Sequence, residues 1–205
     1  SANAPFDGQD TPFAHTESHG PITSFRLARF YGDQTSFVRA QFHSPLTAFS
    51  MVEFHSGSTC FEDSAFYSDR TDFHRARFHS DWTSFIQAQS RGDMTFSAAQ
   101  FDGSTAFRLA RFYGGRTEFG CSRFAGKTTT FVGAKFHSAR TSFAESLFNA
   151  EEPSFRYALF CGTRTLFCNA WFVSERIIFN VAQFRSDGTN FYQARFLSAS
   201  ASFEN

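Results

Sequence analysis

The sequence predicts one all-β domain over residues 1–205, a β-solenoid in which a short repeat winds the chain into stacked coils. Three observations predict it. Phenylalanine, present 32 times, recurs in two fixed columns of a repeat of about twelve residues; the residues around each column alternate between inward and outward types; and turn-forming residues recur between the columns. Repetition at a fixed period is typical of solenoids, whose coils contact only their neighbours.

The repeat follows the rule F-x-x-A-x-F-x-x-x-x-T-x, and about 17 units cover the chain. The unit from Phe25 reads FRLARFYGDQTS and the next reads FVRAQFHSPLTA, while two consecutive units, from Phe85 and Phe96, have eleven residues. The first Phe of each unit defines a first column, and the second Phe defines a second column, which Ser18 and Ser90 interrupt. One aromatic residue type used this often indicates one kind of core position filled many times.

Two segments of each unit, A-x-F and T-x-F, have the period of two that is typical of a strand. The Ala, the Thr and both Phe are therefore expected to point inward, and the residues between them, such as Arg29, Gln41 and Glu53, outward. A helix is disfavoured, because the Phe spacings are five and seven rather than three and four. The expected structural core includes Phe25, Phe30, Phe37, Phe42, Phe49, Phe54, Phe61, Phe66, Phe73, Phe78, Phe131, Phe136, Phe179, Phe184, Ala28, Ala40, Thr35 and Thr47.

Turn-forming residues after the second Phe, as in Gly32-Asp33 and Ser44-Pro45, predict a corner between the two segments. One unit per coil would crowd two inward Phe into a narrow cross-section, whereas two units give four sides and a filled square. We therefore expect about 24 residues per coil and about eight coils. Neighbouring coils should lie about 4.8 Å apart, which stacks the Phe rings into ladders.

The five-residue stretches ARFYG, TSFVR, AQFHS and TAFSM resemble the units of the pentapeptide-repeat family, which have a small residue, a variable one and a central Leu or Phe. The resemblance covers essentially the whole chain. It implies a right-handed quadrilateral β-helix with the small and central residues inside. This sequence departs from the family pattern by two additional residues after every second unit, as in GDQTSF, and these are expected at corners.

Composition argues against several classes of function. Lys plus Arg and Asp plus Glu both number 19, so the net charge is zero and nothing attracts nucleic acid or an anionic membrane over a distance. No apolar run is long enough for membrane insertion. No Ser-His-Asp order, phosphate-binding loop or dinucleotide fingerprint appears. We expect no enzyme activity, no cofactor and no small-molecule substrate.

Four histidines, His43, His55, His79 and His137, directly follow a second-column Phe, and two units per coil would stack His55 on His79. Such a pair could hold a transition metal weakly, but an exposed ladder at a corner is the simpler interpretation, so no metal site is assigned. The cysteines, Cys60, Cys121, Cys161 and Cys168, are too few and scattered for a disulfide framework. Disulfide, metal, cross-linking and unpaired states remain open for Cys161 and Cys168, which are expected to face outward.

The repeat pattern runs to both ends of the sequence. The last residues, Phe203-Glu204-Asn205, form the first part of a unit, and Ala4-Pro5-Phe6 would continue it. One copy could therefore stack on the next, head to tail, and such a contact yields a filament rather than a closed ring. The residues expected at these assembly ends are Ala4, Phe6, Phe13, Phe196 and Phe203.

The leading hypothesis is a structural protein that assembles with itself into an extracellular or cell-surface filament; the sequence begins Ser-Ala-Asn, as a processed secreted protein would. An equally weighted alternative is a monomeric solenoid or a segment of a longer protein. A topoisomerase-inhibiting DNA mimic would need a strongly acidic rod. An ice-binding protein would need outward Thr rows, whereas here the regular Thr points inward and the outward position varies (Ser36, Ala48, Cys60).

Overall fold

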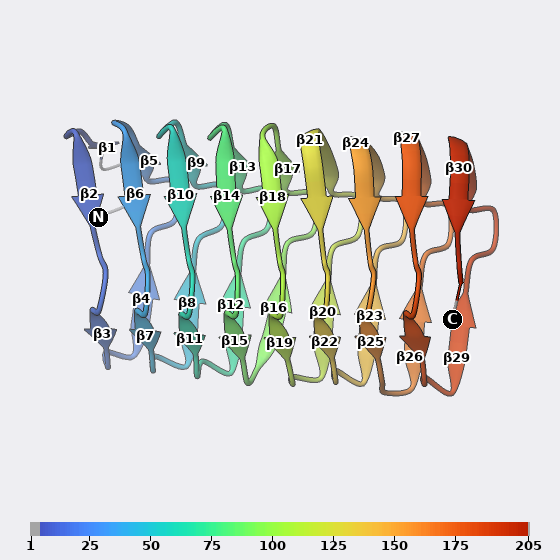
Figure 1. Cartoon of the computed structure of the whole chain (residues 1–205). Coiled ribbons are helices and arrows are strands. Elements are labelled where there is room, and N and C mark those ends of the chain that lie inside the picture. Colours follow the sequence, from blue (N-terminus) through green and yellow to red (C-terminus); the bar gives the residue numbers. More distant parts are fainter. Residues whose placement is uncertain (1–4, 205) are drawn as a thin grey trace.

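The computed structural model describes residues 5–204 as one β-solenoid of about eight coils, with four sides to each coil and no helix. The coils are stacked from the N-terminal to the C-terminal end of the molecule, and each strand pairs in parallel with the strands one coil before and after it (Figure 1). The single stack of coils places all four sides of the molecule around one continuous core.

Strands that lie above one another form four stacks. The first contains β1 (Pro5–Phe6), β5 (Arg29–Phe30), β9 (Glu53–Phe54), β13 (Arg77–Phe78) and β17 (Gln100–Phe101). The second contains β2 (Asp10–Pro12), β6 (Gln34–Ser36), β10 (Ser58–Cys60), β14 (Trp82–Ser84) and β18 (Ser104–Ala106). Towards the C-terminus both stacks continue as the single strands β21 (Arg123–Thr130), β24 (Leu147–Ser154), β27 (Trp171–Ile178) and β30 (Arg195–Ser202).

The other two sides are separate sheets. The third stack contains β3 (Glu17–Ser18), β7 (Gln41–Phe42), β11 (Ala65–Phe66), β15 (Gln89–Ser90), β19 (Arg111–Phe112), β22 (Lys135–Phe136), β25 (Leu159–Phe160) and β28 (Gln183–Phe184). The fourth contains β4 (Ile22–Ser24), β8 (Leu46–Ala48), β12 (Arg70–Asp72), β16 (Asp93–Thr95), β20 (Arg116–Glu118), β23 (Arg140–Ser142), β26 (Arg164–Leu166) and β29 (Gly188–Asn190).

The register confirms the 24-residue coil. Phe30 pairs with Phe54, and Thr35 with Thr59, so each residue lies beside its equivalent two units later. The two eleven-residue units shorten one coil, where Trp82 pairs with Ser104 instead. Glycine stands at the corner of both shorter units, Gly92 and Gly103, and a Cβ on Gly92 would lie 2.1 Å from the backbone oxygen of Ser68.

Phenylalanine ladders fill the core. Rings one coil apart are nearly parallel, as for Phe37 and Phe61, whose centroids are 4.7 Å apart. Rings on neighbouring sides meet edge to face, as for Phe37 and Phe49, at 5.4 Å and 90°. Offset parallel rings and edge-to-face rings both avoid placing the negative faces of two rings directly over each other. Such aromatic pairs contribute about 0.5–1.5 kcal/mol each beyond area burial.

The residues expected in the core are buried, with two exceptions at the outer coils. Phe25 and Phe184 are half-buried, because each lacks part of the neighbouring coil that covers its equivalents. The rest are fully buried: Phe30, Phe37, Phe42, Phe49, Phe54, Phe61, Phe66, Phe73, Phe78, Phe131, Phe136, Phe179, Ala28, Ala40, Thr35 and Thr47.

A second corner, which the sequence did not mark with glycine, follows each first-column Phe. The N–H of Ala28 donates to the carbonyl of Phe25 at 3.0 Å, and the second of the two residues between them, Leu27, has a φ of 60°. A positive φ at this place is typical of a type II turn and normally favours Gly or Asn. The equivalent residue has a positive φ in every described unit, and among these residues only Gly133 is glycine.

The residue before each first-column Phe was expected to face water, and this expectation is wrong for several units. Ala48, Cys60 and Ser84 are buried next to the turn that follows them. Short polar side chains at this position accept a hydrogen bond from the backbone two residues on, as Asp72 does from the N–H of His74 at 2.8 Å. The corner therefore encloses a residue that strand alternation alone would place outside.

Hydroxyl pairs between coils line the core beside the Phe ladders. The inward Thr of one unit bonds to a Ser in the corner of the next coil, as in Thr47–Ser68 at 2.7 Å and Thr59–Ser80 at 2.8 Å. These serines are buried. Ser44, which we interpreted only as a turn former, and its equivalent Ser56 therefore also belong to the interior.

Candidate interaction surfaces

The two ends of the solenoid expose edges that its middle does not. In the described residues, β1 to β4 pair only with the coil after them, and β28, β29 and β30 pair only with the coil before them. Unpaired strand edges of this kind are ready to pair with another chain. The outer rings follow the same pattern, since Phe6, Phe13 and Phe196 are half-buried and Phe203 is 52% exposed. Ala4, the remaining residue expected at these ends, lies outside the described residues.

Stacked rings cover two corners of the coil. On one, His19 stacks on His43 at 4.6 Å and His43 on Tyr67 at 4.6 Å, and the guanidinium of Arg91 lies 4.9 Å from the Tyr67 ring. On the other, Tyr31 stacks on His55. The His55 and His79 rings are 4.8 Å apart, as two units per coil predicted.

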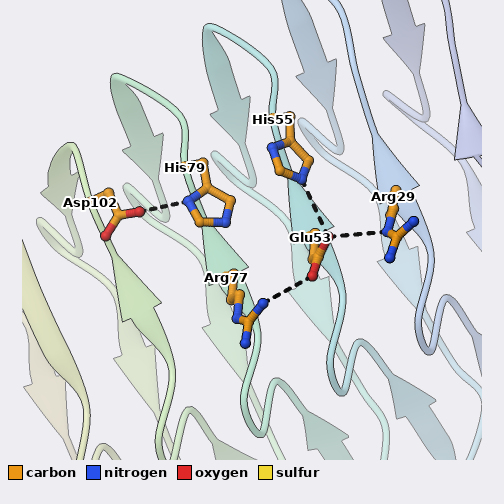
Figure 2. Close-up of polar contacts among 6 residues, drawn as sticks. All are labelled: Arg29, Glu53, His55, Arg77, His79 and Asp102. Carbon is orange, nitrogen blue, oxygen red and sulfur yellow. Dashed lines mark hydrogen bonds and ion pairs between the residues drawn. The ribbon is translucent and has the colours of Figure 1, made fainter.

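Charged residues connect these rings to the outer face of the first stack (Figure 2). Glu53 accepts bonds from Arg29 at 3.1 Å and Arg77 at 3.2 Å, one coil away on either side. Its carboxylate also lies 3.3 Å from the His55 ring, and the next ring, His79, lies 2.6 Å from Asp102. These contacts form a line of alternating charge along the solenoid.

The pKa values of two glutamates shift in opposite directions. Burial raises the pKa of Glu53, but the hydrogen bond with His55 and the charges of Arg29 and Arg77 together outweigh it, so the pKa lies below its ordinary value. For Glu118 burial prevails over the charge of Arg140, and its pKa is raised. The neighbours of Glu53 therefore stabilise its ionised form, whereas burial destabilises the ionised form of Glu118.

All four cysteines are free. Cys60 is buried and Cys121 exposed, while Cys161 and Cys168 are partly exposed. Burial raises the pKa of both Cys60 and Cys121, and a negative charge, from Glu62 and Glu145 respectively, adds to it. A raised pKa keeps a thiol in its unreactive form, so neither has the character of a nucleophile.

The long strands near the C-terminus present an open apolar area. Trp171 is 39% exposed and Leu197 56% exposed, and Val173 pairs in register with Leu197. Arg195 lies over the Trp171 ring at 4.4 Å. A shallow groove of about 720 Å³ runs over three of the long strands, β21, β24 and β27, and its lining includes Lys127, Glu151 and Tyr157.

Among residues 5–204 no three His, Cys, Asp or Glu side chains are placed to hold a metal ion, and no helix there is long and apolar enough to cross a membrane. The chain matches no protein-family model, no curated protein and no solved structure. The pentapeptide-repeat resemblance therefore stays a prediction.

Proposed function

We propose that this chain is a structural protein, a divergent member of the pentapeptide-repeat family, whose copies stack head to tail into an extracellular or cell-surface filament. The observation that carries the proposal is the pair of end faces. Each presents the cross-section of a coil, with half-covered Phe rings such as Phe6 and Phe196 and strands paired on one side only. A second copy would cover both features at once.

The energetic argument follows from the interior. Within the solenoid each coil covers the rings of the one before it, whereas Phe203 at the C-terminal end stacks on Phe179 and has such a neighbour on one side only. Covering a Phe side chain contributes about 1.5–3 kcal/mol when exposure is removed completely. Several half-covered rings at each face, with four strand edges at the N-terminal face and three at the C-terminal face, together favour association.

The two other classes of function find less support. A DNA mimic needs a strongly acidic surface, but Arg29, Arg77 and Glu53 alternate along one side of this neutral chain. Ice binding through Thr needs outward rows, but the regular threonines, such as Thr35 and Thr47, are buried.

Electron microscopy and light scattering of the purified chain over a range of concentrations test the proposal. We expect rods that lengthen with concentration and keep a constant width. Phe203→Asp should shorten them by placing a charge on the end face, whereas Tyr157→Ser, a change on a side face, should not. Particles that stay monomeric at the highest soluble concentration would refute the filament. Recovery of the protein from the outer fraction of the source cells would test the location.

A further inference from the structure

We infer that the partner at the C-terminal face is a second copy of this chain turned by half a rotation about the solenoid axis, in a register that continues the 24-residue coil. The inference rests on the proposed end-to-end association and specifies its geometry. Each coil holds two equivalent twelve-residue units, so a half rotation places one unit where the other would be. This internal symmetry gives the end faces two possible registers, and the two differ in what they bring together.

The half-rotated register pairs every strand edge. β28 would meet β1, β29 would meet β2, and the eight-residue β30 would meet β3 and β4 together. Continuing the observed parallel register, Gln183 would lie beside Pro5, Thr189 beside Thr11 and Arg195 beside Glu17 of the second copy. All four stacks of strands then run on without a gap.

The same register continues the aromatic core. Phe184 would stack on Phe6 of the second copy, Phe191 on Phe13, and Phe203 on Phe25. All six rings are incompletely buried in the single chain. Phe196 would lie beside Ser18 of the second copy rather than beside a Phe. The interior already contains a serine at an equivalent place, Ser90 between Phe66 and Phe112.

Charge complementarity favours this register. It brings together three pairs of opposite charge, Arg185 with Asp7, Arg195 with Glu17, and Glu204 with Arg26, and it places no two like charges beside each other. Pairs at the same offset already exist inside the chain, such as Arg29 and Glu53 at 3.1 Å across one coil. Complementary charges of this kind fix the register of an interface and exclude others.

The unrotated register lacks these features. It stacks Phe196 on Phe6 and Phe203 on Phe13, but it places Arg195 beside Pro5 and forms none of the three pairs. Because β28 and β29 precede β30 along the coil, the third and fourth stacks would each lack one strand at the junction.

Cysteine cross-linking distinguishes the registers. In a chain with Cys121, Cys161 and Cys168 replaced by serine, one copy carries Arg195→Cys and the other carries either Glu17→Cys or Pro5→Cys. Partners in adjacent strands lie about 4.8 Å apart, which a disulfide can span. We expect oxidation to link position 195 to position 17 and not to position 5. Preferential linkage to position 5 in chains that still form rods would overturn the register and leave the filament proposal intact.

Charge reversal gives an independent test. Arg195→Glu alone and Glu17→Arg alone should each raise the concentration needed for assembly by about tenfold or more, because like charges then meet. An equal mixture of the two variants should assemble as the unmodified chain does, since every junction regains an opposite pair. Arg77→Glu, away from both ends, is the matched control and should leave assembly unchanged. A mixture no better than either variant would overturn the register, and failure of the unmodified chain to associate would overturn both proposals.

Discussion

The hydroxyl oxygens of Thr47 and Ser68 lie 2.7 Å apart inside an aromatic core, although 21 residues separate them in the sequence. The same offset accounts for several of the buried hydroxyls that lack a partner. Thr129 is unpaired because Ala150 stands at the partner position, and Ser174 is unpaired because its position 21 residues earlier is Pro153. Hydroxyl pairs of this kind tie several neighbouring coils together, as Thr35–Ser56, Thr59–Ser80 and Thr117–Ser138 do.

Removing one member of a pair should cost stability. In Ser68→Ala the hydroxyl of Thr47 stays buried without its partner, and we expect a loss of about 1–3 kcal/mol in the free energy of unfolding. The double variant with Thr47→Val should recover much of that loss, because neither polar group is then buried. Denaturant unfolding of the wild type, both single variants and the double variant measures the coupling. Strictly additive losses would contradict the pairing.

Adding the missing member should stabilise the protein. Ala150 is buried and faces the unpaired hydroxyl of Thr129, so Ala150→Ser should raise the free energy of unfolding by about 0.5–1.5 kcal/mol. The same substitution in a chain that also carries Thr129→Val is the control and should give no gain. Thermal and denaturant unfolding report the change, and a gain of equal size in both backgrounds would argue against the hydroxyl pair.

The protein should become more stable when the positive-φ position of the turn after a first-column Phe carries a residue that tolerates this conformation. Val181 has a φ of 57°, a conformation that is costly for a β-branched side chain. Val181→Asn should stabilise the chain by about 1 kcal/mol, because Asn adopts this region more readily. Gly133→Val is the reverse change at an equivalent position and should destabilise, since its φ is 65° and a Cβ there would lie 2.8 Å from the Leu109 side chain. Unfolding midpoints of the two variants should move in opposite directions.

The two shifted glutamates predict opposite effects of pH. The pKa of Glu53 is lowered by folding, so its contribution is present above its unfolded pKa of about 4.3 and is lost as the pH falls through the folded pKa. Glu53→Gln should therefore lower stability at pH 7, by up to about 1 kcal/mol, and have little effect in acid. The groups that face this carboxylate are Arg29, Arg77 and His55.

Glu118 provides the matched comparison. Its folded pKa is raised, so ionisation costs stability at neutral pH, and that cost disappears as the pH falls below the unfolded pKa. Glu118→Gln should therefore stabilise slightly at pH 7 and be neutral in acid. Unfolding free energies of both variants, measured at several values between about pH 3 and pH 7, test the signs of the two effects. Effects of the same sign would contradict the assignment.

Local rules predicted the path of the chain well. The two Phe columns, the inward Thr and Ala, and the stacking of His55 on His79 followed from period-two alternation and from the volume of two units per coil. A corner near Leu27 follows from four-sided coils, but its positive φ was missed because the position carries many residue types instead of the Gly that such a φ favours. The burial of Cys60 was missed because it depends on that turn.

The sequence by itself determined the repeat, the residues that face inward and the length of the coil, because each follows from side-chain direction along a strand and from the space that two Phe per unit require. Only the tertiary structure decided which hydroxyl meets which, and which strands stay unpaired at the two ends. Those relationships join residues about one coil apart, and their partners are fixed by the winding of the chain rather than by any local pattern.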